Sequence, residues 1–317
     1  MILEVQHETH LEYTEPVTES TTELRMEPAS DADQTCHTFH PAVSPPAEVF
    51  RYQDGFGNYV HHFNLLAPHQ QVRLLAASVV ETHPRPCDPL TCEATYPLAP
   101  EHLDLGVLDF VQFRGPVRHT SRLDTLLEAL RPRPGVRLAD LPLRTARHIH
   151  EHFEYAPAVT LASSPIDDVL EKGKGVCQDF THLMIAVLRS FGVPARYVSG
   201  YVHRPNKDSQ SHAWCEVWLP GLGWLGIDPT NDCVVGEHFV KVAVGRDFTD
   251  VPPNKGVYRG RAQESMLVRV ETRTLERLPS LSWQEQLPPL NVPLTAILMQ
   301  GSGGRYEDES SQQQQQQ

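Results

Sequence analysis

The sequence predicts an α+β protein in which a β-rich N-terminal domain precedes a helical segment and a second run of strands. Apolar and polar residues alternate through much of roughly the first 95 positions, a pattern typical of half-buried strands. From about residue 100 to 154 the apolar spacing becomes helical, and an apolar helix is expected to begin at Cys177. Five strand-like segments follow that helix: "ARYVSGYV", "SHAWCEVWL", "GWLGID", "HFVKVAVGR" and "ESMLVRVETR".

The N-terminal strands are marked by alternation and by turn residues. The opening "ILEVQHETHLEY" alternates, and "YQDGFGNYVHHFNL" is typical of a hairpin closed near Gly55–Asn58. "QVRLLAASVVETH" is a further strand candidate. The proline-rich "HPRPCDPLTCEATYPLAP" then breaks the pattern. We therefore place the β-rich N-terminal domain at residues 1–95.

The middle of the chain carries helix signals. "SRLDTLLEAL" begins with Ser121 as a candidate N-cap and ends before Pro132, and "LADLPLRTARHIHEHF" also has helical spacing. We assign residues 96–278 to a helical lead-in and the core that follows it. The segment 279–317 contains proline pairs, "GSGG", an acidic patch and six terminal glutamines, so we expect a disordered tail.

Composition and charge exclude several classes of function. Of the 317 residues 40% are hydrophobic, enough for a substantial core, and the net charge is −13. That charge argues against general binding to nucleic acid or to anionic membranes, and the arginines between Arg114 and Arg147 are expected to form a solvated helix face. The N-terminus lacks the pattern of a signal peptide and no run of 18 apolar residues occurs, so we expect a cytoplasmic protein. Homo-oligomer formation stays open.

The six cysteines are scattered, and none form a Cys-x-x-Cys pair. This arrangement fits neither a disulfide framework nor a zinc site. We therefore expect no metal and no other cofactor.

Cys177 follows a glycine-rich stretch, "GKGVC", at the predicted start of a helix. A helix N-terminus favours an anion, and the thiolate is the nucleophilic form of cysteine. Gly173 and Gly175 allow close approach of the backbone, whose N–H groups could face a developing oxyanion. The helix behind Cys177 is apolar on most faces, so we expect it to be central and buried. This position suits a nucleophile.

The two following strands supply a base and a group to orient it. On "SHAWCEVWL" His212, Trp214 and Glu216 share one face, and on "GWLGID" Gly226 shares a face with Asp228. The short Pro-Gly turn between these strands can bring Asp228 beside His212, where a carboxylate would fix the tautomer of the imidazole. Taken singly, each residue also has a structural explanation: a buried thiol, a structural histidine and a turn aspartate.

At these residues the sequence resembles the bacterial transglutaminase-like family of the papain and transglutaminase superfamily. The matching stretches are "GVCQDFTHLMIAVLRSFGVPARYVSGY", "SHAWCEVWLPGLGWLGIDPTN" and "GRDFTDVPPNKGVYRG", and the opening residues resemble the family's N-terminal domain. The resemblance covers about residues 1 to 275. It implies a core in which a catalytic helix packs on an antiparallel sheet, with Cys177 as nucleophile, His212 as general base and Asp228 as orienting acid.

Four further residues match family positions but have less defined roles. Gln178 and Asp179 either cap the helix or shape the site, and Trp214 either shields the His–Asp pair or packs in the core. Tyr155 is a candidate for substrate contact or oxyanion support. The loop "GRDFTDVPP" is either the rim of a cleft or a structural turn.

These residues predict cysteine-dependent acyl transfer on a peptide or amide substrate through a thioester, with a peptide or a protein as the expected partner. Hydrolysis, as in a protease or amidase, is the favoured outcome. Transfer to an amine, as in transglutaminase cross-linking of protein glutamines, uses the same three residues and is the first alternative. A non-catalytic protein-binding scaffold is the second.

Overall fold

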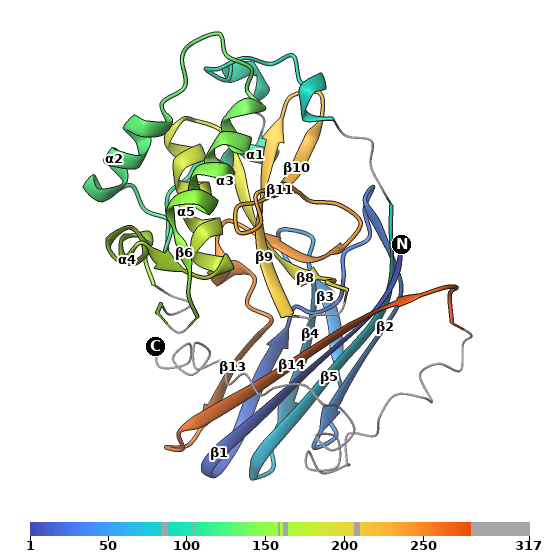
Figure 1. Ribbon diagram of the computed structural model, residues 1–317. Helices are drawn as coiled ribbons and strands as arrows, with labels where there is room; N and C mark the ends of the chain where they lie inside the picture. The colour runs from blue at the N-terminus through green and yellow to red at the C-terminus, as the bar shows by residue number, and fades with distance from the viewer. Residues whose placement is uncertain (84–87, 104, 158, 161–163, 206–209, 280–317) are drawn as a thin grey trace.

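The computed structural model describes residues 1–83, 88–103, 105–157, 159–160, 164–205 and 210–279 (Figure 1). It confirms the α+β class: a curved β-rich region is followed by helices that pack on an antiparallel sheet. The tail predicted to be disordered, residues 279–317, lies outside the described residues except for its first position. Among the described residues no helix is long and apolar enough to cross a membrane.

The N-terminal sheet is built around one long strand, β1 (Ile2–Leu24). Its order is β2-β5-β1-β4-β3, with β2 at Gln34–Ser44, β3 at Phe50–Gln53, β4 at Tyr59–Leu65 and β5 at His69–Thr82. The predicted hairpin is confirmed, because β3 and β4 pair across the turn that contains Gly55.

Two strands from the C-terminal part of the described chain complete the N-terminal sheet. These are β13 (Asn254–Arg259) and β14 (Glu264–Leu275), and both pair antiparallel with β1 (Figure 1). The sequence prediction recognised "ESMLVRVETR" as a strand but placed it with the core. The structure instead places this strand along residues 2–13 of β1. The domain boundaries themselves stay a prediction.

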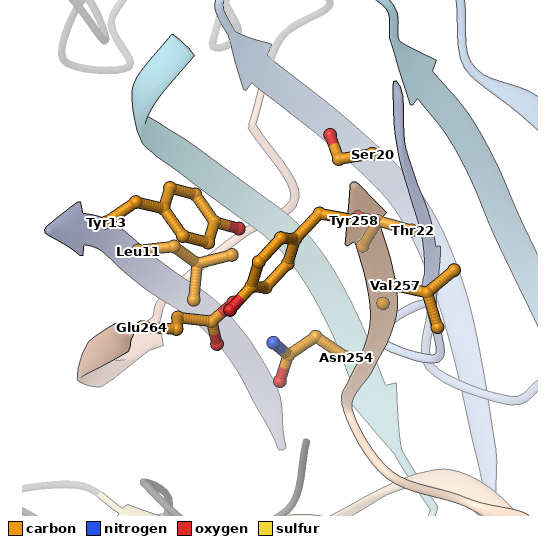
Figure 2. A pocket seen from close by; sticks show the side chains of 9 residues that line it. Leu11, Tyr13, Ser20, Thr22, Asn254, Val257, Tyr258 and Glu264 are labelled. Carbon is orange, nitrogen blue, oxygen red and sulfur yellow. The ribbon is translucent and has the colours of Figure 1, made fainter. Parts of the chain in front are cut away.

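Figure 2 shows a small cavity where β1 passes β13 and β14. Its volume is about 10 Å³, which is about the space that a single water molecule needs. Tyr13, Tyr258 and Glu264 are among the residues that line it. The cavity is therefore too small for a substrate.

The lead-in contains short helices that collect beside the core sheet. They are α1 (Leu105–Leu108), α2 (Ser121–Leu130), α3 (Asp140–His152) and α4 (Ile166–Lys172), with 3-10 turns at Pro89–Thr91, Pro100–His102 and Asp109–Val111. Helix α2 begins at Ser121 as expected, but its N-cap residue is Thr120 rather than Ser121. The hydroxyl of Thr120 donates a hydrogen bond to Asp167. Several of the arginines form ion pairs, among them Arg122 with Glu171.

The core sheet has the order β11-β10-β9-β8-β12, and each neighbouring pair is antiparallel. Its strands are β8 (Ala195–Val202), β9 (Gln210–Leu219), β10 (Gly223–Asp228), β11 (Cys233–Val234) and β12 (Phe239–Gly245). A 3-10 turn at Phe248–Asp250 follows β12. Two very short strands, β6 (Glu154–Tyr155) and β7 (Lys174–Gly175), pair in parallel just before the central helix.

Helix α5 (Cys177–Ser190) is the centre of the second half of the protein. Every residue from Asp179 to Arg189 is buried, which confirms the expectation of a central helix. It packs on β8 and β9 (Figure 1), where Ala213, Cys215 and Val217 share its apolar core. A helix buried along its length is a rigid support for the residue at its start.

Candidate active site

Cys177 is the first residue of α5 and is half-buried. A residue of the first helical turn caps the N-terminus of α5: Asp179 Oδ2 accepts the backbone N–H of Val176 at 2.8 Å. The same oxygen accepts the hydroxyl of Thr160 at 2.5 Å. Burial raises the pKa of Asp179, whereas these two hydrogen bonds favour its ionised form. Of the two roles left open for Asp179, its contacts are those of a helix cap.

The glycines before Cys177 have packing and turn functions. Gly173 ends α4 in the left-handed conformation, with φ at 66°. A Cβ at Gly175 would lie 2.9 Å from the side chain of Asp179 and 3.0 Å from Val169, so only glycine fits there. Tyr155 pairs with Gly175 across β6 and β7, which places this predicted residue beside the start of α5. It is 48% exposed, so a substrate could reach its ring.

His212 and Asp228 lie side by side on β9 and β10. The register pairs Gly226 with Glu216, which brings the end of β10 to the start of β9. His212 Nε2 and Asp228 Oδ2 are 2.8 Å apart, and both side chains are buried. The backbone N–H of Thr230 donates to Asp228 Oδ1 at 2.8 Å, and Asn231 Nδ2 donates to Oδ2 at 2.5 Å. The turn after β10 therefore holds the carboxylate in place.

The charges around His212 favour its protonated form. Burial alone would lower the pKa of this imidazole, but hydrogen bonds to Asp228 and Cys177, together with their negative charges, raise it to about 10. Burial alone would raise the pKa of Asp228, but the hydrogen bond and charge of His212, together with the hydrogen bonds from Asn231 and Thr230, lower it. Because Nε2 faces Asp228, the ring nitrogen that faces Cys177 is Nδ1. The three predicted residues thus form one connected chain.

Trp214 is completely buried and packs in the core as well as beside His212. It belongs to an apolar cluster with Val198 and Val244, and its ring centroid is 6.3 Å from that of His212. A Cβ at Gly200 would lie 2.5 Å from the indole, so glycine is required opposite this ring. Both roles considered for Trp214 fit this position. Gln178, the other predicted residue, is half-buried next to Cys177.

Sequence reasoning missed several buried residues around α5. His182 lies five residues after Cys177 on α5, and its Nε2 accepts the backbone N–H of Phe248 at 3.1 Å. Burial lowers the pKa of His182 to about 3, so it is neutral. The loop "GRDFTDVPP" therefore packs against the helix, and Asp247 within it is fully buried. Tyr197 of β8 also packs on His182, with ring centroids 5.1 Å apart. The sequence signal that could have indicated His182 was a polar residue within an otherwise apolar helix.

A hollow larger than the cavity of Figure 2 lies in the N-terminal part of the protein, where residues of β2, β3 and β4 line it. Its volume is about 390 Å³, and Cys36, Phe39, Arg51 and His61 are among its lining residues. None of the residues predicted for the site lines it. Within the described part of the chain, no group of three or more His, Cys, Asp and Glu side chains is arranged to hold a metal ion.

Comparison with known proteins gives a consistent picture. The profile of the transglutaminase-like superfamily matches residues 137–229, and that of the bacterial transglutaminase-like N-terminal region matches residues 3–81. An uncharacterized protein of Mycobacterium leprae is 36% identical over 288 residues, which cover 86% of this chain and 99% of that protein. A protein-glutamine gamma-glutamyltransferase of Pseudomonas aeruginosa is 32% identical over 165 residues, covering 46% of this chain and 24% of that enzyme.

A solved structure shares the fold. A proposed cysteine protease from Cytophaga hutchinsonii superimposes with a TM-score of 0.70 and 21% sequence identity, over 88% of this chain and 93% of that one. The match includes both the N-terminal sheet and the core, because it spans nearly the whole of each chain.

Proposed function

Because the chain belongs to the bacterial transglutaminase-like family, we propose that it is a cysteine-dependent enzyme that transfers the acyl group of a peptide or amide substrate. The observation that carries the proposal is the connected chain of Cys177, His212 and Asp228, which ends on the turn after β10. Each member has the chemical type that its role needs: a thiol nucleophile, an imidazole base and a carboxylate that orients the base.

The raised pKa of His212 indicates how the proposed reaction begins. At neutral pH this raised pKa keeps the imidazole of His212 protonated, and in the proposed mechanism the imidazolium lies beside the thiolate that attacks. Cys177 Sγ attacks the carbonyl carbon, and the carbonyl oxygen becomes an oxyanion next to the first N–H groups of α5. The Nδ1–H of His212 then protonates the leaving amine, which departs and leaves an acyl-thioester on Cys177.

The acyl group is released in a second step. Neutral His212 takes a proton from water, the hydroxide oxygen attacks the thioester, and the products are a carboxylic acid and the restored Cys177. Cys177 is only half-buried, so water can reach the thioester, and this exposure supports hydrolysis as the outcome. A primary amine in place of water would give amine transfer, the activity in the name of the Pseudomonas relative.

The first test is the rate at which iodoacetamide alkylates Cys177 between pH 5 and 8, measured by peptide mapping. We expect fast labelling at pH 5 to 6 in the wild type and slow labelling in His212→Ala. Cys233 serves as a reference thiol in the same sample, because burial raises its pKa to about 11. Labelling of Cys177 that rises only above about pH 8, as for an ordinary thiol, would contradict the proposal and favour the scaffold alternative.

A second test separates hydrolysis from amine transfer. Peptide libraries are incubated with the protein and a primary amine, and the masses of the products are measured by mass spectrometry. Free acids at the cleaved amide indicate hydrolysis, and a mass increase equal to the amine minus ammonia at glutamine indicates transfer. Cys177→Ala is the control, and it should produce neither.

A further inference from the structure

Strand β12 lies at the edge of the core sheet, and its outer side is met by two amide side chains of the N-terminal sheet. Gln34 Oε1 accepts the N–H of Lys241, and Gln34 Nε2 donates to the C=O of the same residue, both at 2.8 Å. Asn58 makes the same two hydrogen bonds with Val244: its Oδ1 accepts the N–H and its Nδ2 donates to the C=O, both at 2.8 Å. Gln34 and Asn58 are both buried.

These contacts reproduce the hydrogen bonds of a neighbouring strand. In an antiparallel pair, one residue exchanges both its N–H and its C=O with the residue opposite. An irregularity between Lys241 and Ala243 shifts the register of β12 against β8. Lys241 and Val244, three positions apart, therefore both turn their polar groups outward. The two amides are the partners of the N–H groups of Lys241 and Val244, and the C=O of Lys241 also accepts the backbone N–H of Ala29 at 3.1 Å.

Charged and apolar contacts strengthen the same junction. Lys241 Nζ lies 2.8 Å from Asp31 and 2.6 Å from Glu216, so it joins the N-terminal sheet to β9. Phe56, in the turn between β3 and β4, packs on the cluster that contains Trp214 and Val244. The sequence motif "DGFGN" thus has a specific role, because its Phe56 and Asn58 both contact the core.

Strand β12 in turn contacts His212. The ring of Phe239, its first residue, lies 6.1 Å from the imidazole and 5.4 Å from the indole of Trp214. The carbonyl oxygen of Val240 lies so close to Gly200 that a Cβ there would be 2.2 Å away, and Gly200 pairs with His212. A displacement of β12 would therefore move two of the surfaces against which His212 packs.

We infer that Gln34 and Asn58 are positioning residues for His212. They hold strand β12, whose Phe239 packs on the imidazole and on Trp214 of β9 and so orients the imidazole toward Cys177. The inference rests on the proposed function. It gives the N-terminal sheet a defined part in the reaction, as a clamp that completes the core sheet. The two amides do not touch the reacting atoms, and their effect on His212 passes through β12.

The test uses the full chain with Gln34→Met and Asn58→Ala. Methionine has nearly the length of glutamine but makes neither hydrogen bond. Hydrogen exchange should speed up at the amide of Lys241 in the first variant and of Val244 in the second. The alkylation rate of Cys177 at pH 6, divided by the rate at pH 9, should fall about tenfold, within the range found for residues that act through a packed network.

A matched control separates positioning from general destabilisation. Val72 is buried in a cluster of the N-terminal sheet that does not include β12, and Val72→Ala should weaken that sheet and leave the alkylation ratio unchanged. Faster exchange with an unchanged ratio in the amide variants would overturn the positioning role, and unchanged exchange would overturn the clamp. The wild-type pH profile alone tests the proposed function, so the two ideas can fail separately.

Discussion

Replacing Asp228 by asparagine tests the arrangement around His212 most directly. Each carboxylate oxygen of Asp228 accepts two donors: His212 Nε2 and Asn231 Nδ2 at Oδ2, and the backbone N–H groups of Thr230 and Asn231 at Oδ1. An amide has only one oxygen. If that oxygen keeps the two backbone donors, the new NH₂ group faces His212, which must then present an unprotonated Nε2. The proton moves to Nδ1, and the imidazolium can no longer form without losing a hydrogen bond.

The size of the effect follows from these contacts. A hydrogen bond to a charged group contributes about 1.5–3 kcal/mol, or roughly 10- to 150-fold in rate. The same substitution in the Ser-His-Asp triad lowers turnover about 10⁴-fold through the wrong tautomer. We therefore expect Asp228→Asn to slow alkylation of Cys177 at pH 6 by at least about tenfold, and amide turnover by between about 10² and 10⁴.

The assay is the alkylation profile from pH 5 to 8, with urea unfolding to confirm that the variant is folded. Asp232→Asn is the matched control, because it removes the same charge four residues away, where the partner is Arg147 rather than His212. A folded Asp228→Asn protein that alkylates within about threefold of the wild type would refute the orienting role. Loss of the fold would instead show that Asp228 mainly stabilises the turn.

Three further substitutions probe the packing around the site. Gly200→Ala should destabilise the fold by about 1–3 kcal/mol or more in urea unfolding, because its Cβ meets Trp214, whereas Gly236→Ala, with open space, should not. Asp179→Ala should cost about 1–2 kcal/mol through the lost cap, and Asp179→Asn much less. The buried His182 stays neutral while the unfolded chain binds a proton below about pH 6.5, so stability is lost as the pH falls. Between pH 7 and 5 His182→Gln should therefore lose about 2 kcal/mol less than the wild type.

The parts of the structure that the sequence predicted well are those governed by local pattern. Strands β4, β5, β8, β9 and β10, and helix α5, follow from alternation, helical spacing and turn residues, all of which act over a few positions. The approach of His212 to Asp228 was also predictable, because a two-stranded hairpin with a short turn has few possible registers.

Long-range pairing was not predictable in this way. Nothing in the composition of "ESMLVRVETR" indicates that β14 lies beside residues 2–13 rather than beside β12, since both neighbours offer an alternating edge. The roles of Gln34 and Asn58 were hidden for the same reason. An amide next to a turn is ordinary in sequence, and only the fold shows that each one meets the backbone of a residue about 200 positions away.

The limits of the matched family profiles therefore differ from the limits of the structure that supports the site. The superfamily profile ends at residue 229, before β11 and β12 begin, and the N-terminal profile ends at residue 81, before β13 and β14. Yet β12 supplies Phe239 to the surroundings of His212, and β13 and β14 occupy one side of β1. A fragment cut at the profile limits would lose these strands and expose the edges of both sheets. The site is thus supported by contacts that run from Ile2 to Leu275, and the chain must be tested over that whole span.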